Sequence, residues 1–512
     1  MRSVPRSTVI MSRYLYSIVL ITAFVSIRSL SAGTLHVAIG SSPNNLDPYY
    51  ATDANSQDIN RLLHLSLVDS TRSMKTECRA CVNFKESRIA NGQHKITFTL
   101  KENLRFHDGS KVTPQNIKES VERLLLQDKA PIPGLFNELV GCNIISEDQV
   151  ALIYKNYRPE NLTNLSLLKI EKFNSDNKRI PAGSYKLVSK SENEVVVKSE
   201  SQTIVFKVVG DETTMALKLM NGEVDLIATT ISPRKTNWLA EQENIKVFER
   251  EGTNYVYISP QHRHPDLQNV LVRKALSHAI PRADLAKYKQ KDTVALAQGM
   301  FSSAFNGLYL SEREAVDYDP SKSRELLIKA GYDFKGELWH KDGRQLSLTL
   351  KISNKKHIIE LAKALVPYFA KIGVPLRVQP AEWGTFYRDL KAGNFDLALG
   401  QWIGFVGPDQ MGFTFSRDSF PPNGANRGFY YDEEFEKYYS LALNDQDSRK
   451  SELYYRQANQ RLIDDEAYIS LWHPKIMWIA NDCVKSLELY PTGNFLAFET
   501  LEHQCLKKNT TP

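Results

Sequence analysis

Two cysteines three residues apart are the first side chains whose type and spacing suggest chemistry. Cys78 and Cys81 have the separation found in zinc sites and redox motifs. Zinc needs two further ligands at a matching spacing, and none follows nearby, so we disfavour a metal or redox function. In an oxidising compartment we expect a structural bridge between Cys483 and Cys505. Because the chain has five cysteines, at least one thiol stays free if the rest pair.

Two polar clusters resemble metal or catalytic sites and have plainer explanations. His262 and His264 are two residues apart on a loop, where histidines are more often solvated than metal-bound. Asp464, Asp465 and Glu466 form a carboxylate run, but neighbouring positions on a helix point in different directions. We therefore expect a solvated face there. The chain has no G-x-S-x-G elbow, glycine-rich phosphate loop or H-E-x-x-H pair, so no catalytic residue is assigned.

One loop combines aromatic side chains with glycine and proline. Residues 401–409 read QWIGFVGPD and follow directly after a strand-like segment. Rigid aromatic faces give apolar contact at low entropic cost, and glycines let a ligand approach the backbone. The alternative is a core loop with structural aromatics, which has the same composition. The candidate ligand contacts in this loop are Trp402, Gly404, Phe405 and Asp409.

The elements that must position this loop alternate between helices and strands. Hydrophobic residues recur at helical spacing in some segments and at every second position in others. Such alternation favours layered α/β lobes, and Pro367 is expected to kink its helix or shift its start. The expected strands cover 35–39, 96–100, 104–106, 224–228, 374–378 and 395–399, and the expected helices cover 113–125, 215–220, 358–372 and 386–390.

Length and charge limit the classes of protein that fit. The chain has 512 residues, of which 42% are hydrophobic, so it is too long for a single core and should form two or three lobes. Its formal net charge is +6, but the first 32 residues hold four arginines and no acid, and 6 minus 4 leaves +2. Binding to nucleic acid needs a clustered surplus of lysine and arginine, and the remaining chain has none.

The first 32 residues are typical of an export signal. Arginines occur up to Arg13, an apolar run covers 15–27, and small residues follow at 31–33, so we expect cleavage after Ala32. The alternative is an uncleaved anchor, but about 13 apolar residues fall short of the roughly 20 that span a bilayer. No cysteine follows the run, so a lipid-modified N-terminus is excluded. We expect a mature protein that is free in the periplasm and not lipid-anchored.

Several segments, in their order along the chain, resemble the family 5 extracellular solute-binding proteins, the peptide- and nickel-binding class of ABC importers. Residues 96–126, ITFTLKENLRFHDGSKVTPQNIKESVERLLL, are similar to the signature region of that family. The resemblance covers nearly the whole mature chain. Its other segments are PAGSY at 181–185, LKLMNGEVDLI at 217–227, 272–280 with Arg282, YDP at 318–320, LLIKAGY at 326–332, and the stretches 372–402 and 458–471.

The resemblance implies an α/β architecture, the two-lobed periplasmic-binding-protein fold (type II-like, cluster C) with an extra subdomain on the first lobe. By that analogy a ligand binds between the lobes and favours the closed form, which a membrane permease recognises. Lobe I would comprise 33–49, 180–260 and 478–512, the extra subdomain 50–179, and lobe II 261–477.

The function implied by the resemblance is capture of an oligopeptide or peptide-like solute and its delivery to an ABC transporter permease, without catalysis or a cofactor. In peptide-binding relatives, an acid three positions after a tryptophan holds the ligand's amino group. Phe405 stands at that position after Trp402, which argues against an amine anchor there. Asp409 is one substitute. Alternatively, Phe405 stacks on a sugar or aromatic group or faces a cation.

The resemblance also directs attention to residues outside the loop. Arg427 is a candidate partner for a ligand carboxylate, and a surface salt bridge is the alternative. Tyr430 follows it, and Asn44 and Ser259 lie in segments expected near the cleft. Other functions remain open: a binding protein for a saccharide or metal complex, a ligand sensor for a membrane receptor, and a secreted enzyme. We expect a monomer with no nucleic-acid partner.

Overall fold

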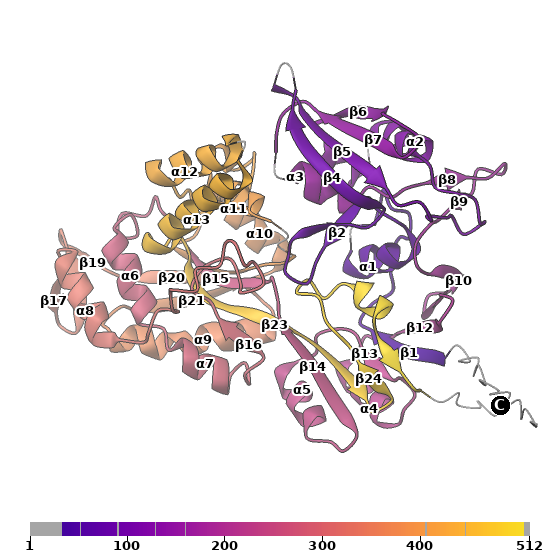
Figure 1. Cartoon of the computed structure of the whole chain (residues 1–512). Helices are drawn as coiled ribbons and strands as arrows, with labels where there is room; N and C mark the ends of the chain where they lie inside the picture. Colours follow the sequence, from indigo (N-terminus) through magenta and orange to yellow (C-terminus); the bar gives the residue numbers. More distant parts are fainter. Residues whose placement is uncertain are drawn as a thin grey trace, which may run out of the picture.

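The secondary-structure elements fall into groups, each with its own hydrophobic core (Figure 1). The computed structural model describes residues 33–505 except 52, 90, 91, 128, 129, 159, 405, 406 and 446. The export signal expected in residues 1–32 and the candidate contact Phe405 therefore lie outside the described residues. Here the first half means residues 33–251 and 484–505, and the second half means residues 255–464.

The first half contains two packed units. One is built on a parallel pairing of its N-terminal strand, with Gly33 opposite Gln202. Its elements are β1 (Gly33–Ile39), α1 (Ala54–Leu63), β10 (Lys186–Lys190), β11 (Glu194–Lys198), β12 (Gln202–Val208), α4 (Glu212–Met220), β13 (Leu226–Ile227), α5 (Pro233–Ala240), β14 (Ile245–Glu251), β24 (Val484–Ser486), a 3-10 helix at Phe495–Glu499, and β25 (Glu502–His503).

The other unit is a four-stranded antiparallel sheet, β4-β5-β7-β6, covered by one long helix. Its elements are β2 (Val68–Ser70), β3 (Thr76–Cys78), β4 (Cys81–Arg88), β5 (His94–Leu100), α2 (Pro114–Leu125), a 3-10 helix at Pro133–Phe136, β6 (Leu139–Ile144), β7 (Gln149–Tyr154), α3 (Glu160–Thr163), a 3-10 helix at Asn164–Ser166, β8 (Lys172–Phe173) and β9 (Arg179–Ile180).

The second half places helices around parallel and antiparallel strands. Its elements are β15 (Tyr255–Pro260), α6 (Val270–His278), α7 (Arg282–Tyr288), β16 (Val294–Leu296), α8 (Pro320–Lys329), β17 (Asp333–Lys335), β18 (Leu338–Lys341), β19 (Arg344–Gln345), β20 (Leu348–Ser353), α9 (Lys356–Lys371), β21 (Leu376–Ala381), α10 (Trp383–Ala392), β22 (Leu397–Trp402), α11 (Asp409–Phe415), a 3-10 helix at Arg417–Ser419, α12 (Glu433–Asn444) and α13 (Ser448–Asp464).

One strand connects the two halves. β23 (Ile469–Asn481) pairs with β15 and β16 near its start and with β13 and β14 near its end. Through it the strands form a twelve-stranded sheet in the order β10-β11-β12-β1-β13-β23-β15-β22-β20-β21, with β14 and β16 also on β23. Figure 1 shows β23 running between the two halves. Any surface at this crossing is therefore built from distant parts of the chain.

Local signals explain the elements that the sequence predicts. In α2 the backbone N–H of Thr113 donates to the Oδ1 atom of Asn116 at 2.9 Å, Pro114 occupies the first turn, and Ile117 and Val121 are fully buried. The helix expected from 358 runs through Pro367 and begins at Lys356, so the proline does not shift its start. The strand expected at 104–106 is wrong, since only an isolated bridge from Arg105 to Lys111 forms there.

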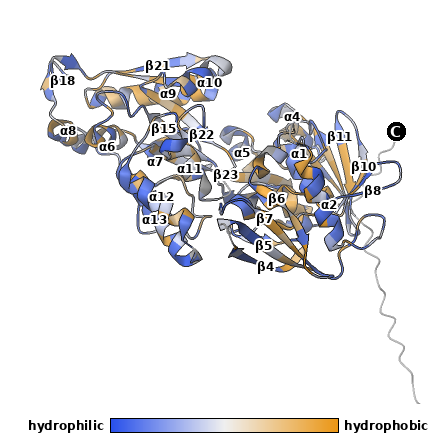
Figure 2. Cartoon of the chain, turned by 90° about the horizontal axis from the view of Figure 1, so that it is seen from above, coloured by the Kyte–Doolittle hydropathy of each residue, from blue (hydrophilic) through white to orange (hydrophobic). Residues whose placement is uncertain are grey.

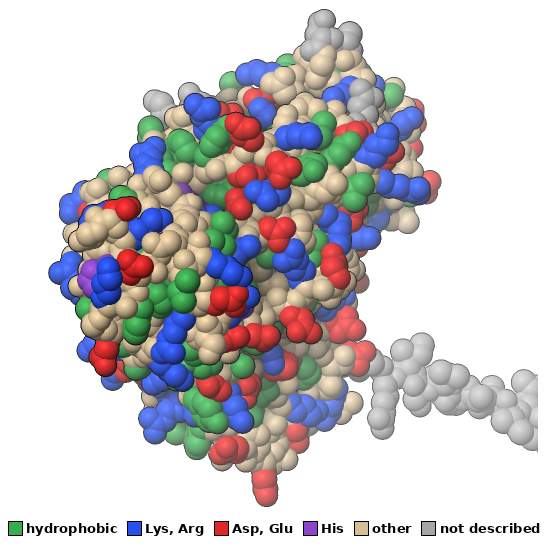
Figure 3. Space-filling model, turned by 90° about the vertical axis from the view of Figure 1, so that its left-hand side faces the viewer, with side chains coloured by type: hydrophobic (Ala, Val, Ile, Leu, Met, Phe, Trp, Pro, Cys, Tyr) green, Lys and Arg blue, Asp and Glu red, His purple; other side chains and the backbone are tan. Residues whose placement is uncertain are grey.

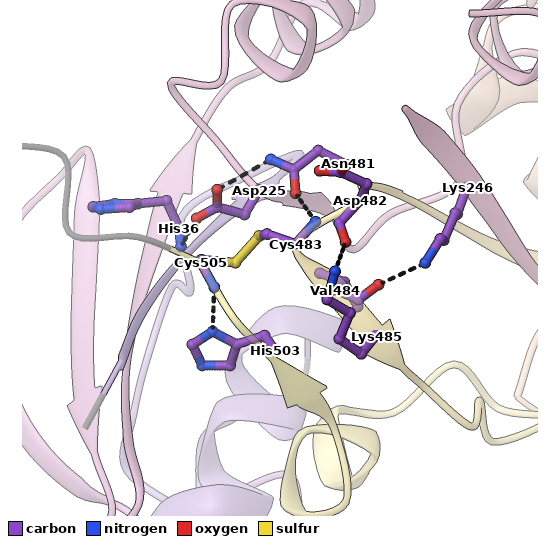
Figure 4. The surroundings of a disulfide bond; sticks show 10 residues. All are labelled: His36, Asp225, Lys246, Asn481, Asp482, Cys483, Val484, Lys485, His503 and Cys505. Atoms are coloured by element: carbon purple, nitrogen blue, oxygen red, sulfur yellow. Dashed lines mark hydrogen bonds between the residues drawn. A yellow bond between two sulfur atoms is a disulfide. The ribbon is translucent and has the colours of Figure 1, made fainter. Parts of the chain in front are cut away.

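The cysteines form two disulfides, Cys78–Cys81 and Cys483–Cys505, and Cys142 is a buried free thiol. The expected bridge and the odd thiol are confirmed. A carboxylate oxygen of Asp225 lies within 4.8 Å of both sulfur atoms of Cys483–Cys505. That carboxylate accepts hydrogen bonds from the backbone N–H of His36 (2.9 Å) and from Asn481 (3.1 Å), as Figure 4 shows. Because the two sulfur atoms are bonded to each other, the cluster links separate segments of the chain through a disulfide bond and hydrogen bonds.

Polar and apolar residues are distributed as the layers require. Both hydropathy colours occur on most helices in Figure 2, because one side packs on a sheet and the other meets solvent. Figure 3 shows lysine and arginine interspersed with aspartate and glutamate, so the face it presents is not uniformly basic. Among the residues that the structure describes, no helix combines the length and apolar character needed to cross a membrane.

Candidate ligand-binding site

A cavity of about 410 Å³ lies where β23 passes between the halves. From the first half it is lined by residues at the start of α5, including Ile231 and Pro233. From the second half it is lined by β15, β22, α9 and α10, and Trp472 and Met477 of β23 contribute from the crossing itself. The volume falls within the range of about 300–1,000 Å³ that is typical of small-molecule sites. A ligand in this cavity contacts both halves.

Aromatic rings form one wall of the cavity. Trp383 and Tyr387 are four residues apart on α10, so they lie on the same helix face, and their stacked rings are 6.0 Å apart. The ring of Tyr257 on β15 stacks on Tyr468 at 4.0 Å. A side chain at Gly400 would meet the Tyr257 ring at 2.8 Å, so this glycine is what lets the ring lie against β22. The wall is rigid and offers flat apolar faces.

Arg427 is held among these rings. Its guanidinium carbon lies 4.9 Å from the centroid of the Tyr387 ring and 5.4 Å from that of Trp402, and Nη2 donates to the Tyr387 hydroxyl at 3.3 Å. In the described part of the chain, no carboxylate is at ion-pair distance from Arg427, and its buried Nε–H has no hydrogen-bond acceptor. The salt bridge considered as an alternative is therefore not formed with any described residue.

The charged residues around the cavity are all basic. Lys355, Arg427 and Lys475 line it, and no aspartate or glutamate occurs among its described lining residues. Lys475 is paired with Glu249 at 3.0 Å, whereas Lys355 has no ion-pair partner in the described chain. His357 also lines the cavity, and burial, followed by the charge of Lys355, lowers the pKa of its imidazole below 6.5. Near neutral pH this histidine is therefore mostly uncharged.

The predicted loop borders two cavities. Gln401 and Ile403 line the cavity described above. Gly407 and Pro408 line a second cavity of about 290 Å³, which also receives residues of the first half such as Met74. Gly404 adopts a positive φ of 74° and its N–H donates to Asn254 at 3.0 Å. The loop thus lies along the junction of the two halves.

The structure brings only some of the predicted contacts together. Trp402 and Arg427 lie side by side in space. Gly404 is two residues after Trp402 in the sequence, and Asp409 is the first residue of α11. Tyr430 is elsewhere: only 2% exposed, it packs in the core of the second half and donates to Asp465 at 3.1 Å. Ser259 is buried on β15, and Asn44 is exposed before α1. Neither lines the cavity at the crossing, and of the other described candidates only Arg427 does.

Sequence reasoning missed Trp383, Tyr387, Tyr257 and Lys355. A signal existed for the first two, because aromatic residues four apart on a helix share a face. Tyr257 lies in a continuous run of apolar residues in a fully buried strand and gave no separate signal. Lys355 gave no signal of a binding role either, because a lysine directly before a helix is common in proteins.

Two expectations about the polar clusters are wrong. His262 is not a solvated loop histidine: its Nε2 lies 3.0 Å from the carbonyl oxygen of Ala467 and its ring packs edge-on against Tyr430. The carboxylate run is not a solvated face either, because Glu466 is only 7% exposed. The helix ends at Asp464, and Glu466 turns inward with a positive φ of 46°.

Comparison with known proteins agrees with this arrangement. A family model described as bacterial extracellular solute-binding proteins, family 5 Middle, matches residues 84–423. The chain belongs to this family. This family 5 protein is 22% identical over 478 residues to the oligopeptide-binding protein AppA of Bacillus subtilis, covering 86% of each chain. It is 30% identical over 302 residues to the di/tripeptide-binding protein 3 of Pseudomonas aeruginosa, covering 56% of this chain and 53% of the relative.

Solved structures agree on the fold. An ABC transporter substrate-binding protein from Sinorhizobium meliloti superposes with a TM-score of 0.80 at 19% identity, covering 92% of this chain and all of that one (100%). The two-lobed α/β binding-protein fold expected from the resemblance is confirmed. The family consists of solute-binding proteins, so the cavity at the crossing lies in a protein whose class binds solutes.

Proposed function

We propose that this protein captures an oligopeptide or peptide-like solute between its two lobes and delivers it to the permease of an ABC transporter. The observation that carries the proposal is the cavity at the β23 crossing, because its lining comes from both halves. A ligand that contacts both halves stabilises the arrangement in which they lie together. The permease then recognises the closed form.

A peptide-like ligand fits the chemistry of the cavity. Stacked aromatic rings suit apolar side chains, and Gln401, Thr293 and Ser353 supply polar contacts. Relatives that match 86% and 56% of the chain are named an oligopeptide-binding protein and a di/tripeptide-binding protein, respectively. Of the contacts expected from the sequence, we retain Arg427, which lines the cavity, and Trp402, whose ring lies beside its guanidinium.

The proposal also has finer features. The protein acts without catalysis, because binding and release of an unchanged solute is all that delivery to a permease needs. It is exported by a signal peptide that is cleaved after Ala32, stays free in the periplasm and acts as a monomer. Its lobes follow the boundaries given above: lobe I at 33–49, 180–260 and 478–512, the extra subdomain at 50–179, and lobe II at 261–477.

Native mass spectrometry of the mature protein, purified from a periplasmic extract, tests this function. The expected result is a set of bound masses that disappear on denaturation and are identified as intact short peptides. A single bound saccharide or metal complex would replace the peptide assignment. Incubation with a defined tripeptide library, followed by mass analysis of the library, tests for catalysis: unchanged peptides are expected, and cleavage products would make the protein an enzyme.

A further inference from the structure

A hairpin of the first half reaches into the hydrophobic core of the second half. β2 and β3 pair antiparallel, with Ser70 opposite Thr76, and Met74 lies in the turn that joins them. Met74 packs against a cluster whose buried members all lie between Tyr255 and Tyr468. Among the described residues it is the only member of that cluster from the first half. The β2–β3 turn therefore makes a contact that exists only while the two halves lie together.

The turn is held in shape by its own backbone and by one hydroxyl. The N–H of Met74 donates to the carbonyl oxygen of Thr71 at 3.1 Å, and the Oγ1 atom of Thr71 accepts from the N–H groups of Ser73 and Lys75, both at 3.1 Å. Met74 has a φ of 57°, in the left-handed region that residues other than glycine seldom adopt. Such a conformation persists only where the surroundings hold it, so the direction in which Met74 leaves the turn is fixed.

The hairpin is fastened to the first half on both of its strands' sides. Arg79, which follows β3, makes two hydrogen bonds to the Glu499 carboxylate, at 2.9 and 2.6 Å. Arg72, which follows β2, donates to the Thr500 hydroxyl at 2.8 Å. Both partners belong to the C-terminal segment of the first half. The hairpin therefore moves with the first half, and separation of the halves must withdraw Met74 from the second.

The same four-stranded unit makes a second contact with the second half. Arg88, the last residue of β4, donates to the carbonyl oxygen of Leu443 at 3.4 Å. Leu443 is in the last turn of α12, which has no basic residue of its own there, so this guanidinium complements the negative end of the helix. Met74 shares the lining of the cavity of about 290 Å³ with Phe305 and Leu308 of the second half. The unit thus meets the second half through one apolar and one polar contact.

We infer that the β2–β3 hairpin is a latch: Met74, carried by the first half, holds the two halves together, and Arg88 supports it. The inference rests on the proposed function and adds a conformational control to it, because neither residue lines the cavity that we assign to the ligand. Contacts made in only one arrangement raise its population, and they must break before an enclosed solute can leave. The latch therefore slows the release of a ligand without touching it.

Release of bound peptides from matched variants tests the latch. Met74→Ala removes the apolar contact, Met74→Leu keeps most of it, and Met220→Ala is the control, because Met220 on α4 is 39% exposed and lines neither cavity. Each protein is loaded with a mixed library of tripeptides that have free carboxylates (tripeptide acids) and diluted, and mass analysis follows the peptides that remain bound. Met74→Ala should speed the release of every peptide about fivefold to twentyfold, whatever its sequence. Met74→Leu and Met220→Ala should stay within about twofold of wild type.

Hydrogen–deuterium exchange without peptide measures the latch independently of any ligand. Met74→Ala should speed exchange in the segment 305–308, which lines the same cavity as Met74, whereas the leucine variant and the control should not. Thermal unfolding checks that all variants are folded. Exchange or release by Met74→Ala at the rate of Met220→Ala would overturn the latch, and faster release of only some peptides would make Met74 a ligand contact instead. If wild-type protein retains no peptide, the proposed function fails and the exchange result alone decides the latch.

Discussion

The guanidinium of Arg427 lies over the ring of Tyr387, with 4.9 Å between its central carbon and the ring centroid. The two residues are 40 positions apart and belong to different segments, since Tyr387 is on α10 and Arg427 precedes α12. The ring therefore fixes where the cation points within the cavity. Affinity for an anionic ligand should depend on this contact although Tyr387 itself carries no charge.

Two substitutions at Tyr387 distinguish the contribution of its ring to ligand affinity from the contribution of its hydroxyl. Tyr387→Ala removes both, and it should weaken binding of tripeptide acids roughly two- to thirtyfold, the range of cation–π contacts. Tyr387→Phe keeps the ring and loses only the 3.3 Å hydrogen bond, so its affinity should stay within about twofold of wild type. Calorimetric titration measures both. A phenylalanine variant as weak as the alanine variant would assign the effect to the hydroxyl.

A hydrogen bond between the halves should influence closure. The hydroxyl of Ser303 in the second half donates to Glu251 of β14 at 2.5 Å, and its backbone N–H donates to the same carboxylate at 3.2 Å. Ser303→Ala should lower peptide affinity by about fivefold, corresponding to a net hydrogen bond of about 1 kcal/mol lost from the closed form. Ser146→Ala, which loses a similar bond to nearby Asp148, is the control. Equal affinity of the two variants would contradict a role in closure.

The two disulfides should differ in their contribution to stability. Cys483–Cys505 closes a sequence separation of 22 residues and Cys78–Cys81 one of 3. In the chain-entropy model, replacing the first pair by serine lowers the free energy of unfolding by about 3 kcal/mol, and replacing the second by about 1.5 kcal/mol. Urea denaturation of the two double variants measures the difference. The reverse order would show that strain or residual structure outweighs loop entropy here.

Glu466 should make stability depend on pH. Burial raises the pKa of its carboxyl from 4.5 to about 7, although Arg282 and a hydrogen bond with Ser277 act in the opposite direction. The folded form then holds a proton that the unfolded form has released. Its contribution to the free energy of unfolding is greatest below about pH 4.5, falls as pH rises to about 7, and is constant above that.

The variant Glu466→Gln isolates this effect, because glutamine does not titrate. Urea denaturation between about pH 4 and about pH 8 should show wild-type stability declining relative to the glutamine variant. Asp464→Asn, at the end of the same carboxylate run with a side chain that is 38% exposed, serves as the control. A difference between wild type and Glu466→Gln that is constant across this range would show that the buried carboxyl does not titrate there.

Local structure was predictable where a few neighbouring residues decide it. Thr113 and Pro114 mark the start of α2, and glycines with positive φ follow α4, α9 and α10 at Gly222, Gly373 and Gly393. These signals act within one helical turn, so periodicity and capping rules detect them. Family resemblance supplied the two-lobed fold, which no local signal contains.

Long-range structure was not predictable from periodicity. The parallel pairing of β1 with β12 joins Gly33 to Gln202, and nothing in either strand specifies the other. β23 was missed as a single thirteen-residue strand because Pro474 stands in its middle, and proline argues against a central strand. Its carbonyl oxygen accepts from the N–H of Gly252, which keeps the two halves connected there.

The binding site was predictable only in part, because it too is built from segments that are distant in the sequence. The composition of one loop points to Trp402 and Gly404, which are neighbours in sequence of the lining residues Gln401 and Ile403, whereas Arg427 lines the cavity itself. Arg427 has no ion-pair partner among the described residues, and this depends on which residues surround it in space, which only the folded chain shows. The inward turn of Glu466 likewise depends on where α13 ends relative to the core of the second half.

Hydrogen–deuterium exchange with and without tripeptide acids tests most directly whether the ligand lies between the two halves. The account predicts that saturating peptide slows exchange on both sides of the cavity, in the segment 230–240 of the first half and in the segments 383–403 and 425–428 of the second. Protection confined to one half, or to surfaces away from the β23 crossing, would contradict capture between the lobes.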